Sequence, residues 1–135
     1  MNSDVLREAI KDYNNGDYTK ALTSLIVCDI SDDDYIFYYY IGLCYIKLKD
    51  YGQGIDNLEL FLDRDDNLLR IFQTRMLISY SYIAIEMYDK SHRTLTGLLE
   101  SGFESAKLYS LLGFTYFKQN LLHKSIKNYR KALSI

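Results

Sequence analysis

Small residues recur along this chain at a nearly constant spacing, and this repetition limits the folds that the chain can adopt. The first set is separated by 33, 37 and 34 residues and consists of Ala9, Gly42, Ser79 and Gly113. A second small residue follows twelve positions after each of them, at Ala21, Gly54, Ser91 and Ser125. Four copies with the same internal spacing indicate one supersecondary unit that is repeated and stacked, because one unit cannot bury its apolar face alone.

Each copy contains apolar residues at helical spacing on both sides of a short polar break. The break in the first copy includes Gly16, which suits a left-handed turn at a helix end. The chain has no proline, and its hydrophobic content of 48% is enough for a continuous core. We therefore predict an all-α fold in which Gly52 and Gly54 open one helix. The other helices are expected at residues 3–15, 18–30, 35–48, 68–86, 88–100, 105–119 and 121–134. The acidic run 32–34 falls where the helix at 35–48 begins, and its carboxylates are expected to cap that helix.

The longer spacing of 37 residues predicts about three extra residues in a loop or helix near residue 68.

Two segments carry a family resemblance: residues 16–22 read Gly-Asp-Tyr-Thr-Lys-Ala-Leu, and residues 109–116 read Tyr-Ser-Leu-Leu-Gly-Phe-Thr-Tyr. Both resemble the tetratricopeptide repeat, a helix-turn-helix unit of about 34 residues. The resemblance implies four helical hairpins stacked in a right-handed superhelix (an α-solenoid). It covers one domain, residues 1–135, with repeats at approximately 2–34, 35–68, 72–105 and 106–135.

The resemblance also implies a concave groove, because the first helix of each hairpin lines that face in this family. Its positions fall on the polar Ser110 and on eleven apolar or aromatic residues: Leu6, Ile10, Tyr13, Tyr39, Leu43, Ile46, Met76, Tyr80, Ile83, Phe114 and Phe117. An uncovered apolar strip is typical of a surface that binds a peptide or a second subunit. The sequence thus predicts a non-catalytic interaction module, a scaffold or adaptor. The alternative is that these side chains are core residues of a closed superhelix.

Charge is unevenly distributed along the chain. Residues 1–70 carry a net charge of −7 and residues 71–135 carry +5. The basic half has no dense cluster interleaved with aromatic residues, so nucleic acid is not an expected partner. The two halves could instead pair between two copies, which makes a homodimeric structural strut an alternative function.

The two ends of the repeat array differ in polarity. Glu8 and Asp12 stand where later copies have apolar or aromatic residues, as expected of a repeat whose outer face contacts water. No polar-faced helix covers the last repeat, which ends at Ile135. The uncovered last repeat therefore suggests two hypotheses: the chain associates with itself, or it is a fragment of a longer repeat array.

The sequence also indicates where the chain works. No basic segment followed by an apolar run marks a secretory signal, and no apolar run reaches the ~18 residues of a membrane helix. Cys28 and Cys44 form neither a metal-binding pair nor a disulfide framework. We expect no membrane insertion and a cytoplasmic location, or a nuclear one in a eukaryotic cell.

No motif indicates catalysis or a cofactor. Residues 63–67 begin like a calcium-binding loop, but Leu68 and Thr74 occupy the positions that require glycine and glutamate. His92 and His123 lie on different predicted helices, and apart from Asp89 near His92 neither has a cysteine or carboxylate at metal-binding spacing. We therefore expect no enzyme activity, no metal and no cofactor.

Overall fold

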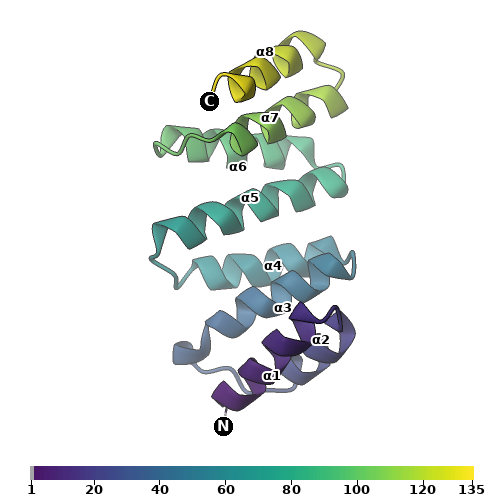
Figure 1. Ribbon diagram of the computed structural model, residues 1–135, viewed down its shortest axis with the longest axis vertical. Coiled ribbons are helices and arrows are strands. Elements are labelled where there is room, and N and C mark those ends of the chain that lie inside the picture. Colours follow the sequence, from purple (N-terminus) through teal and green to yellow (C-terminus); the bar gives the residue numbers. More distant parts are fainter. Residues whose placement is uncertain (1) are drawn as a thin grey trace. The chain divides into compact units, whose positions relative to one another are not determined.

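The computed structural model describes residues 2–135, and these residues form helices and no strand (Figure 1). The all-α prediction is confirmed. Eight α-helices and one short 3-10 helix follow in order: α1 (Asn2–Asn14), α2 (Tyr18–Ile26), η1 (Asp32–Asp34), α3 (Ile36–Lys47), α4 (Tyr51–Leu62), α5 (Leu68–Ala84), α6 (Tyr88–Glu100), α7 (Ala106–Lys118) and α8 (Leu122–Leu133).

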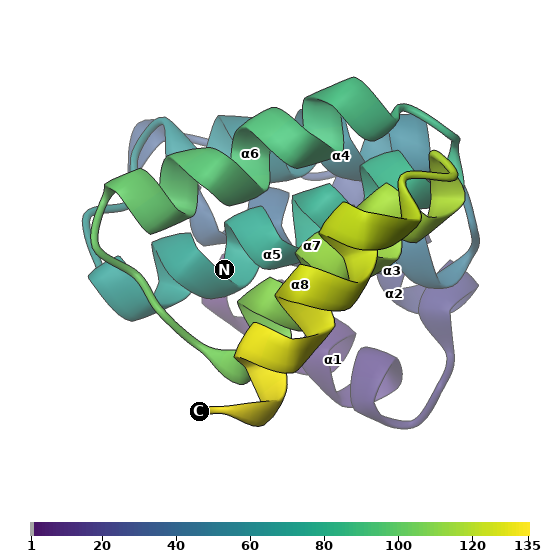
Figure 2. The same ribbon diagram turned by 90° about the horizontal axis from the view of Figure 1, so that it is seen from above.

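Consecutive helices pair as four hairpins: α1 with α2, α3 with α4, α5 with α6, and α7 with α8. The hairpins belong to two compact units. Unit 1 is Met1–Asp66 and contains α1 to α4, and unit 2 is Asn67–Ile135 and contains α5 to α8. Within each unit the hairpins contact each other through α2 and α3 or through α6 and α7. Figure 2 shows α8 lying along α7 in unit 2.

Unit 1 has its own apolar core. One cluster of its buried residues consists of Ala9, Ala21, Leu25, Phe37, Ile41 and Cys44. The small residues of the repeat lie where α3 and α4 approach each other. A Cβ atom added to Gly42 would lie 2.8 Å from Leu58, and one added to Gly54 would lie 2.5 Å from Cγ1 of Ile46. These glycines therefore set the distance between the two helices.

Unit 2 has a second core, made by Met76, Leu95, Leu98, Leu108 and Leu112. The same use of small residues recurs between α7 and α8. A Cβ atom at Gly113 would lie 3.0 Å from the ring of Tyr129. The buried hydroxyl of Ser125 donates a hydrogen bond of 2.8 Å to the carbonyl oxygen of Gly113. The repeated small residues are thus contact points between paired helices.

A left-handed residue ends the first helix of every hairpin. The residues are Gly16, Lys49, Glu86 and Asn120, with φ angles of 87°, 66°, 62° and 62°. Each follows its repeat's first small residue by seven positions. The sequence predicts this conformation at Gly16 alone, since the other three positions do not carry glycine.

Three local expectations need correction. Helix α2 ends at Ile26 rather than near residue 30, although apolar residues continue beyond it. The acidic run Asp32–Asp34 forms a 3-10 helix, and no side chain caps the following helix, α3. Asp12 is buried and lies 3.7 Å from the ammonium of Lys20, so it does not belong to a water-facing surface.

The extra residues near position 68 lengthen a helix. Helix α5 has 17 residues, whereas the other first helices of hairpins have 12 or 13. The added length lies in α5 itself rather than in an expanded loop.

Candidate functional site

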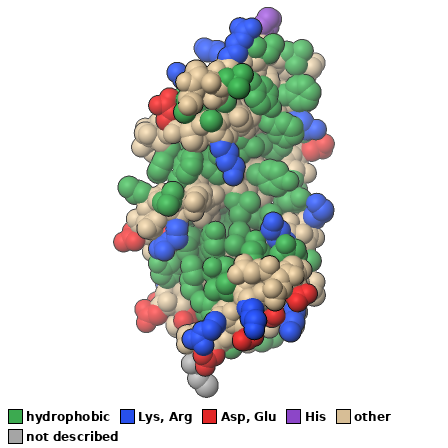
Figure 3. Space-filling model, viewed as in Figure 1, with side chains coloured by type: hydrophobic (Ala, Val, Ile, Leu, Met, Phe, Trp, Pro, Cys, Tyr) green, Lys and Arg blue, Asp and Glu red, His purple; other side chains and the backbone are tan. Residues whose placement is uncertain are grey.

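The predicted strip is most exposed in unit 2, on the contacting helices α5 and α7. Tyr80 is 48% exposed, Phe114 is 37% exposed and Phe117 is 55% exposed. The ammonium of Lys118 lies 6.0 Å from the centre of the Phe114 ring, within reach of a cation–π interaction. Hydrophobic side chains reach the surface among the helices of this unit (Figure 3).

The remaining strip residues of unit 2 have a different environment. Met76 belongs to the core, and Ile83 is 5% exposed. Of the predicted strip residues on α5 and α7, Tyr80, Phe114 and Phe117 are therefore the exposed ones.

The strip of unit 1 lies on α1 and α3 and is more enclosed. Leu6, Ile10, Tyr39 and Leu43 are half-buried, and Ile46 is buried. The ring of Tyr39 lies 5.0 Å from that of Phe61 and 5.3 Å from that of Tyr40.

Tyr13, the last strip residue of unit 1, has an aromatic environment as well. Its ring lies 5.2 Å from the ring of Tyr18 and 6.3 Å from that of Tyr40. Burial raises the pKa of Tyr13 to about 12. Most of the residues that the sequence assigns to a groove in unit 1 therefore pack against other residues of that unit.

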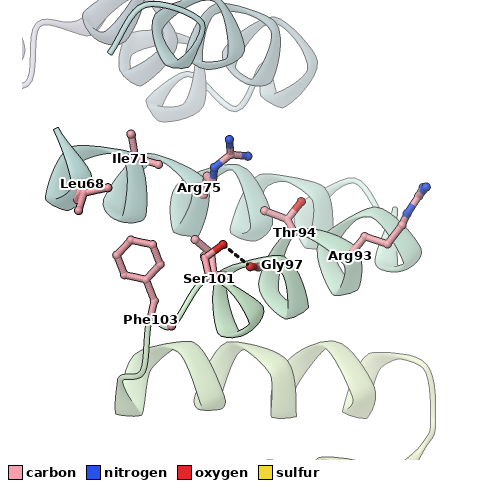
Figure 4. Close-up of a pocket in the computed structure, with 10 residues that line it drawn as sticks. Leu68, Ile71, Arg75, Arg93, Thr94, Gly97, Ser101 and Phe103 are labelled. Atoms are coloured by element: carbon pink, nitrogen blue, oxygen red, sulfur yellow. Dashed lines mark hydrogen bonds between the residues drawn. The ribbon is translucent and has the colours of Figure 1, made fainter. Parts of the chain in front are cut away.

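Two exposed features of unit 2 lie outside the predicted residues. One is a stripe on α8 formed by Leu122, Ile126, Tyr129 and Leu133. Its helical periodicity is visible in the sequence, but no expectation used it. The other is a depression of about 520 Å³ between α5 and α6, whose lining includes Leu68, Arg75, Arg93, Gly97 and Phe103 (Figure 4). A glycine in the middle of α6 is the one sequence signal that points to it.

The titratable residues that the sequence singles out are buried or form hydrogen bonds within the fold. Nε2 of His92 lies 2.8 Å from the hydroxyl of Tyr116 and forms a hydrogen bond that links α6 to α7. Asp65 is buried and accepts a hydrogen bond of 3.2 Å from the hydroxyl of Tyr35. Cys44 is buried, and burial raises the pKa of its thiol to about 11. Both cysteines are free.

No metal-ligating cluster is present within the described part of the chain, where no three His, Cys, Asp or Glu side chains could hold an ion. Over the same residues, no helix combines the length and the apolar character needed to cross a membrane.

Sequence comparison identifies repeats of a known family. Residues 35–68 and 106–135 match the tetratricopeptide repeat family. The first segment contains the hairpin of α3 and α4 in unit 1, and the second contains the hairpin of α7 and α8 in unit 2. No curated protein sequence matches the chain.

Solved structures of MamA have a similar fold. A crystal structure of MamA is 19% identical and aligns with a TM-score of 0.79, over 96% of this chain and 75% of that chain. MamA 41-end from Desulfovibrio magneticus RS-1 is 20% identical, with a TM-score of 0.80 over 98% of this chain and 73% of that chain. The MamA RS-1 ArsTM double mutant is 19% identical and aligns with a TM-score of 0.82, over 96% of this chain and 72% of that chain. The likeness shows a shared fold over nearly the whole chain.

Proposed function

This chain carries tetratricopeptide repeats, a family of protein-interaction scaffolds, and we propose that it binds a protein partner through the aromatic strip of unit 2. The supporting observation is the exposure of Tyr80, Phe114 and Phe117 on the first helices of two consecutive hairpins. Aromatic side chains provide large contact areas with little loss of rotamer freedom. Exposed rings on rigid helices are suited to be the residues that contribute most to binding.

The surroundings of the strip support this role. Met76 and Ile83, on the same helix as Tyr80, are buried, so α5 is anchored in the core of unit 2 while its aromatic ring reaches the surface. The partner would be a helical or extended peptide segment that buries the three rings. We further propose that the chain is not an enzyme and that it acts in the cytoplasm, where its free cysteines would stay reduced.

The test compares capture of partners by the wild-type protein and by the Phe114→Ala/Phe117→Ala variant. The immobilised protein is incubated with lysate of the native host, and bound proteins are identified by mass spectrometry. Loss of a buried aromatic hot spot costs about 2 kcal/mol or more, which corresponds to roughly thirtyfold weaker binding. We expect one or more proteins to be lost from the variant.

Ile126→Ala is the matched control, since Ile126 is 50% exposed in the same unit but lies on α8, outside the strip. Circular dichroism checks that all variants retain their helices. Equal capture by the wild type and the strip variant, with both folded, contradicts the proposal. So does an equal loss in the Ile126→Ala control.

A second candidate function is a homodimeric strut, which the distribution of charge favours. Residues 1–66 contain six Lys or Arg and fourteen Asp or Glu, a net charge of −8. Residues 67–135 contain ten and four, a net charge of +6. Unit 1 of one copy and unit 2 of another would attract each other at low ionic strength.

Light scattering at two salt concentrations tests the strut. One chain has a mass of 15.9 kDa. A dimer held by opposite charges has twice this mass at low salt and dissociates as salt screens the attraction. A monomer at both salt concentrations excludes this candidate and leaves the strip proposal intact.

A further inference from the structure

A groove separate from the aromatic strip lies between α5 and α6 in unit 2. Its larger part is the depression of about 520 Å³, and a second depression of about 360 Å³ adjoins it. The two share Arg75, Arg93 and Thr94 among their lining residues. They therefore form one groove that follows α5 from Leu68 to Tyr82. We call it the α5–α6 groove.

The dimensions of the groove match a short extended peptide. Residues 68 and 82 are fourteen positions apart on α5, which corresponds to roughly 21 Å along a helix at 1.5 Å per residue. An extended chain advances about 3.3 Å per residue, so roughly six residues span the groove.

One end of the groove is cationic. Arg75, Lys90 and Arg93 line it, and the described residues that line the two depressions include no Asp or Glu. Within unit 2, neither arginine forms an ion pair of 4.0 Å or shorter with a described residue. Figure 4 shows the two arginine side chains on different helices, with their guanidinium groups apart from each other. Their charges are therefore spaced to meet successive anionic groups rather than one.

Acidic residues do occur nearby. Glu86 and Asp89 line a different depression, of about 420 Å³, which Arg93 also borders. The absence of an ion pair between Arg93 and these carboxylates leaves the guanidinium available to the groove.

The other end of the groove is apolar. Leu68 is 69% exposed, and Phe103 lies across from it in the close-up of Figure 4. The Phe103 ring stacks on Phe72 at 5.0 Å between ring centres, which fixes its position. Buried Leu98 also lines this depression. This end has the composition of a site for one large apolar side chain.

Gly97, in the middle of α6, keeps the wall of the groove open. A glycine inside a helix lowers its stability relative to alanine. The packing here does not require it, because a Cβ atom at Gly97 would meet nothing within 4 Å, and its backbone is helical. The missing side chain instead leaves room for another backbone to approach α6.

We propose that the α5–α6 groove binds an acidic peptide segment in an extended conformation. A large apolar side chain of the segment lies between Leu68 and Phe103, and its acidic side chains pair with Arg75 and Arg93. The groove includes none of the exposed rings of the strip, so this proposal stands apart from the function proposed above.

The probe is a fluorescein-labelled peptide with an amidated C-terminus, in which a leucine is followed by a run of glutamates. Binding to the full chain is measured by fluorescence anisotropy at physiological salt. We expect saturable binding that Arg75→Glu/Arg93→Glu weakens at least about tenfold, since reversed charges at a contact repel the ligand. Gly97→Leu should weaken binding to a similar degree by filling the groove, and a probe with serine in place of leucine should bind more weakly.

Two matched controls separate the groove from general effects. Lys124→Glu/Lys127→Glu changes the net charge equally but lies on α8. Gly52→Leu places the same side chain at another helical glycine whose Cβ position is open. Both controls should bind the probe like the wild type.

Four outcomes overturn the proposal. They are a wild-type protein that does not bind the probe, an arginine variant that binds undiminished, and a loss in the lysine control as large as in the arginine variant. The fourth is a wild-type protein that is oligomeric beside a Gly97→Leu variant that is monomeric, which would identify a second copy of the chain as the occupant of the groove.

Discussion

At the scale of single residues, the packing of the two helices within a hairpin depends on how closely their backbones approach. Gly54 lies in such a contact, where a Cβ atom would be 2.5 Å from Cγ1 of Ile46 and 3.2 Å from the carbonyl oxygen of Gly42. The obstructing atom belongs to a buried β-branched side chain and cannot move away easily. Gly52, two residues earlier on the same helix, faces open space. The two glycines therefore offer a direct comparison.

We predict that Gly54→Ala lowers the free energy of unfolding by about 1–3 kcal/mol, the usual cost of overpacking. Gly52→Ala should leave it unchanged or raise it by up to about 1 kcal/mol, because alanine favours the helix. Urea denaturation followed by circular dichroism measures both. Equal effects of the two substitutions would mean that Gly54 does not set the helix distance.

The left-handed turn residues carry strain that glycine would remove. Glu86 has a φ of 62°, the conformation that Gly16 adopts in the first hairpin. We predict that Glu86→Gly raises the free energy of unfolding by up to about 1 kcal/mol. Glycine removes the cost of holding an L-residue in the left-handed conformation, and its greater freedom in the unfolded chain offsets part of this gain. Gly16→Ala should lower it by a similar amount. The same urea titration decides the sign of each change.

The buried thiol of Cys44 links stability to alkaline pH. Burial raises its pKa from 9.0 to about 11. Between these values the unfolded chain loses the proton and the folded chain keeps it, so the stability present below pH 9 is lost as the pH rises towards 11. Tyr13 acts in the same direction between pH 10 and 12, since burial raises its pKa to about 12. Urea titrations should show a smaller fall over pH 9 to 11 for Cys44→Ala than for the wild type.

At the scale of helices, side-chain caps fix where some elements begin. The hydroxyl of Ser105, in extended backbone conformation, accepts a hydrogen bond of 3.1 Å from the backbone N–H of Leu108 at the start of α7. We predict that Ser105→Ala lowers the free energy of unfolding by about 1 kcal/mol, whereas Ser105→Asp retains most of it because the carboxylate accepts the same bond. Equal loss in both variants would show that the cap contributes nothing.

Helix positions followed from the periodicity of the sequence to within a few residues, except at one end. The 88–100 prediction coincides with α6, which begins and ends at those residues. The end of α2 was wrong, because apolar residues continue past Ile26 and a hydrophobic pattern does not distinguish a buried side chain from an exposed one. Val27 is 77% exposed. The short helix at Asp32–Asp34 replaces the expected caps, since Asp34 accepts hydrogen bonds from Asn2 and Ser31 instead.

At the scale of the whole molecule, repetition alone was sufficient to predict an all-α chain of hairpins. The sequence was less informative about which strip residues contact solvent. Met76 and Tyr80 occupy one helix four residues apart, yet Met76 is buried and Tyr80 is 48% exposed. Their difference depends on the neighbouring helices, which a one-dimensional pattern does not contain. The α5–α6 groove was missed for the same reason, because its lining comes from two helices and the turn after them.

Each unit has a core made of its own residues, and this leads to a prediction about the separated halves. The cores are centred on Phe37 and Ile41 in unit 1 and on Leu95 and Leu108 in unit 2. We expect residues 1–66 and 67–135, expressed as separate polypeptides, each to show helical circular dichroism and a cooperative thermal transition. Each half should be only marginally stable, because a domain of about 60 residues buries only about 60% of the surface that its unfolded chain exposes. A half that lacks helical signal under native conditions would show that its core depends on the other half.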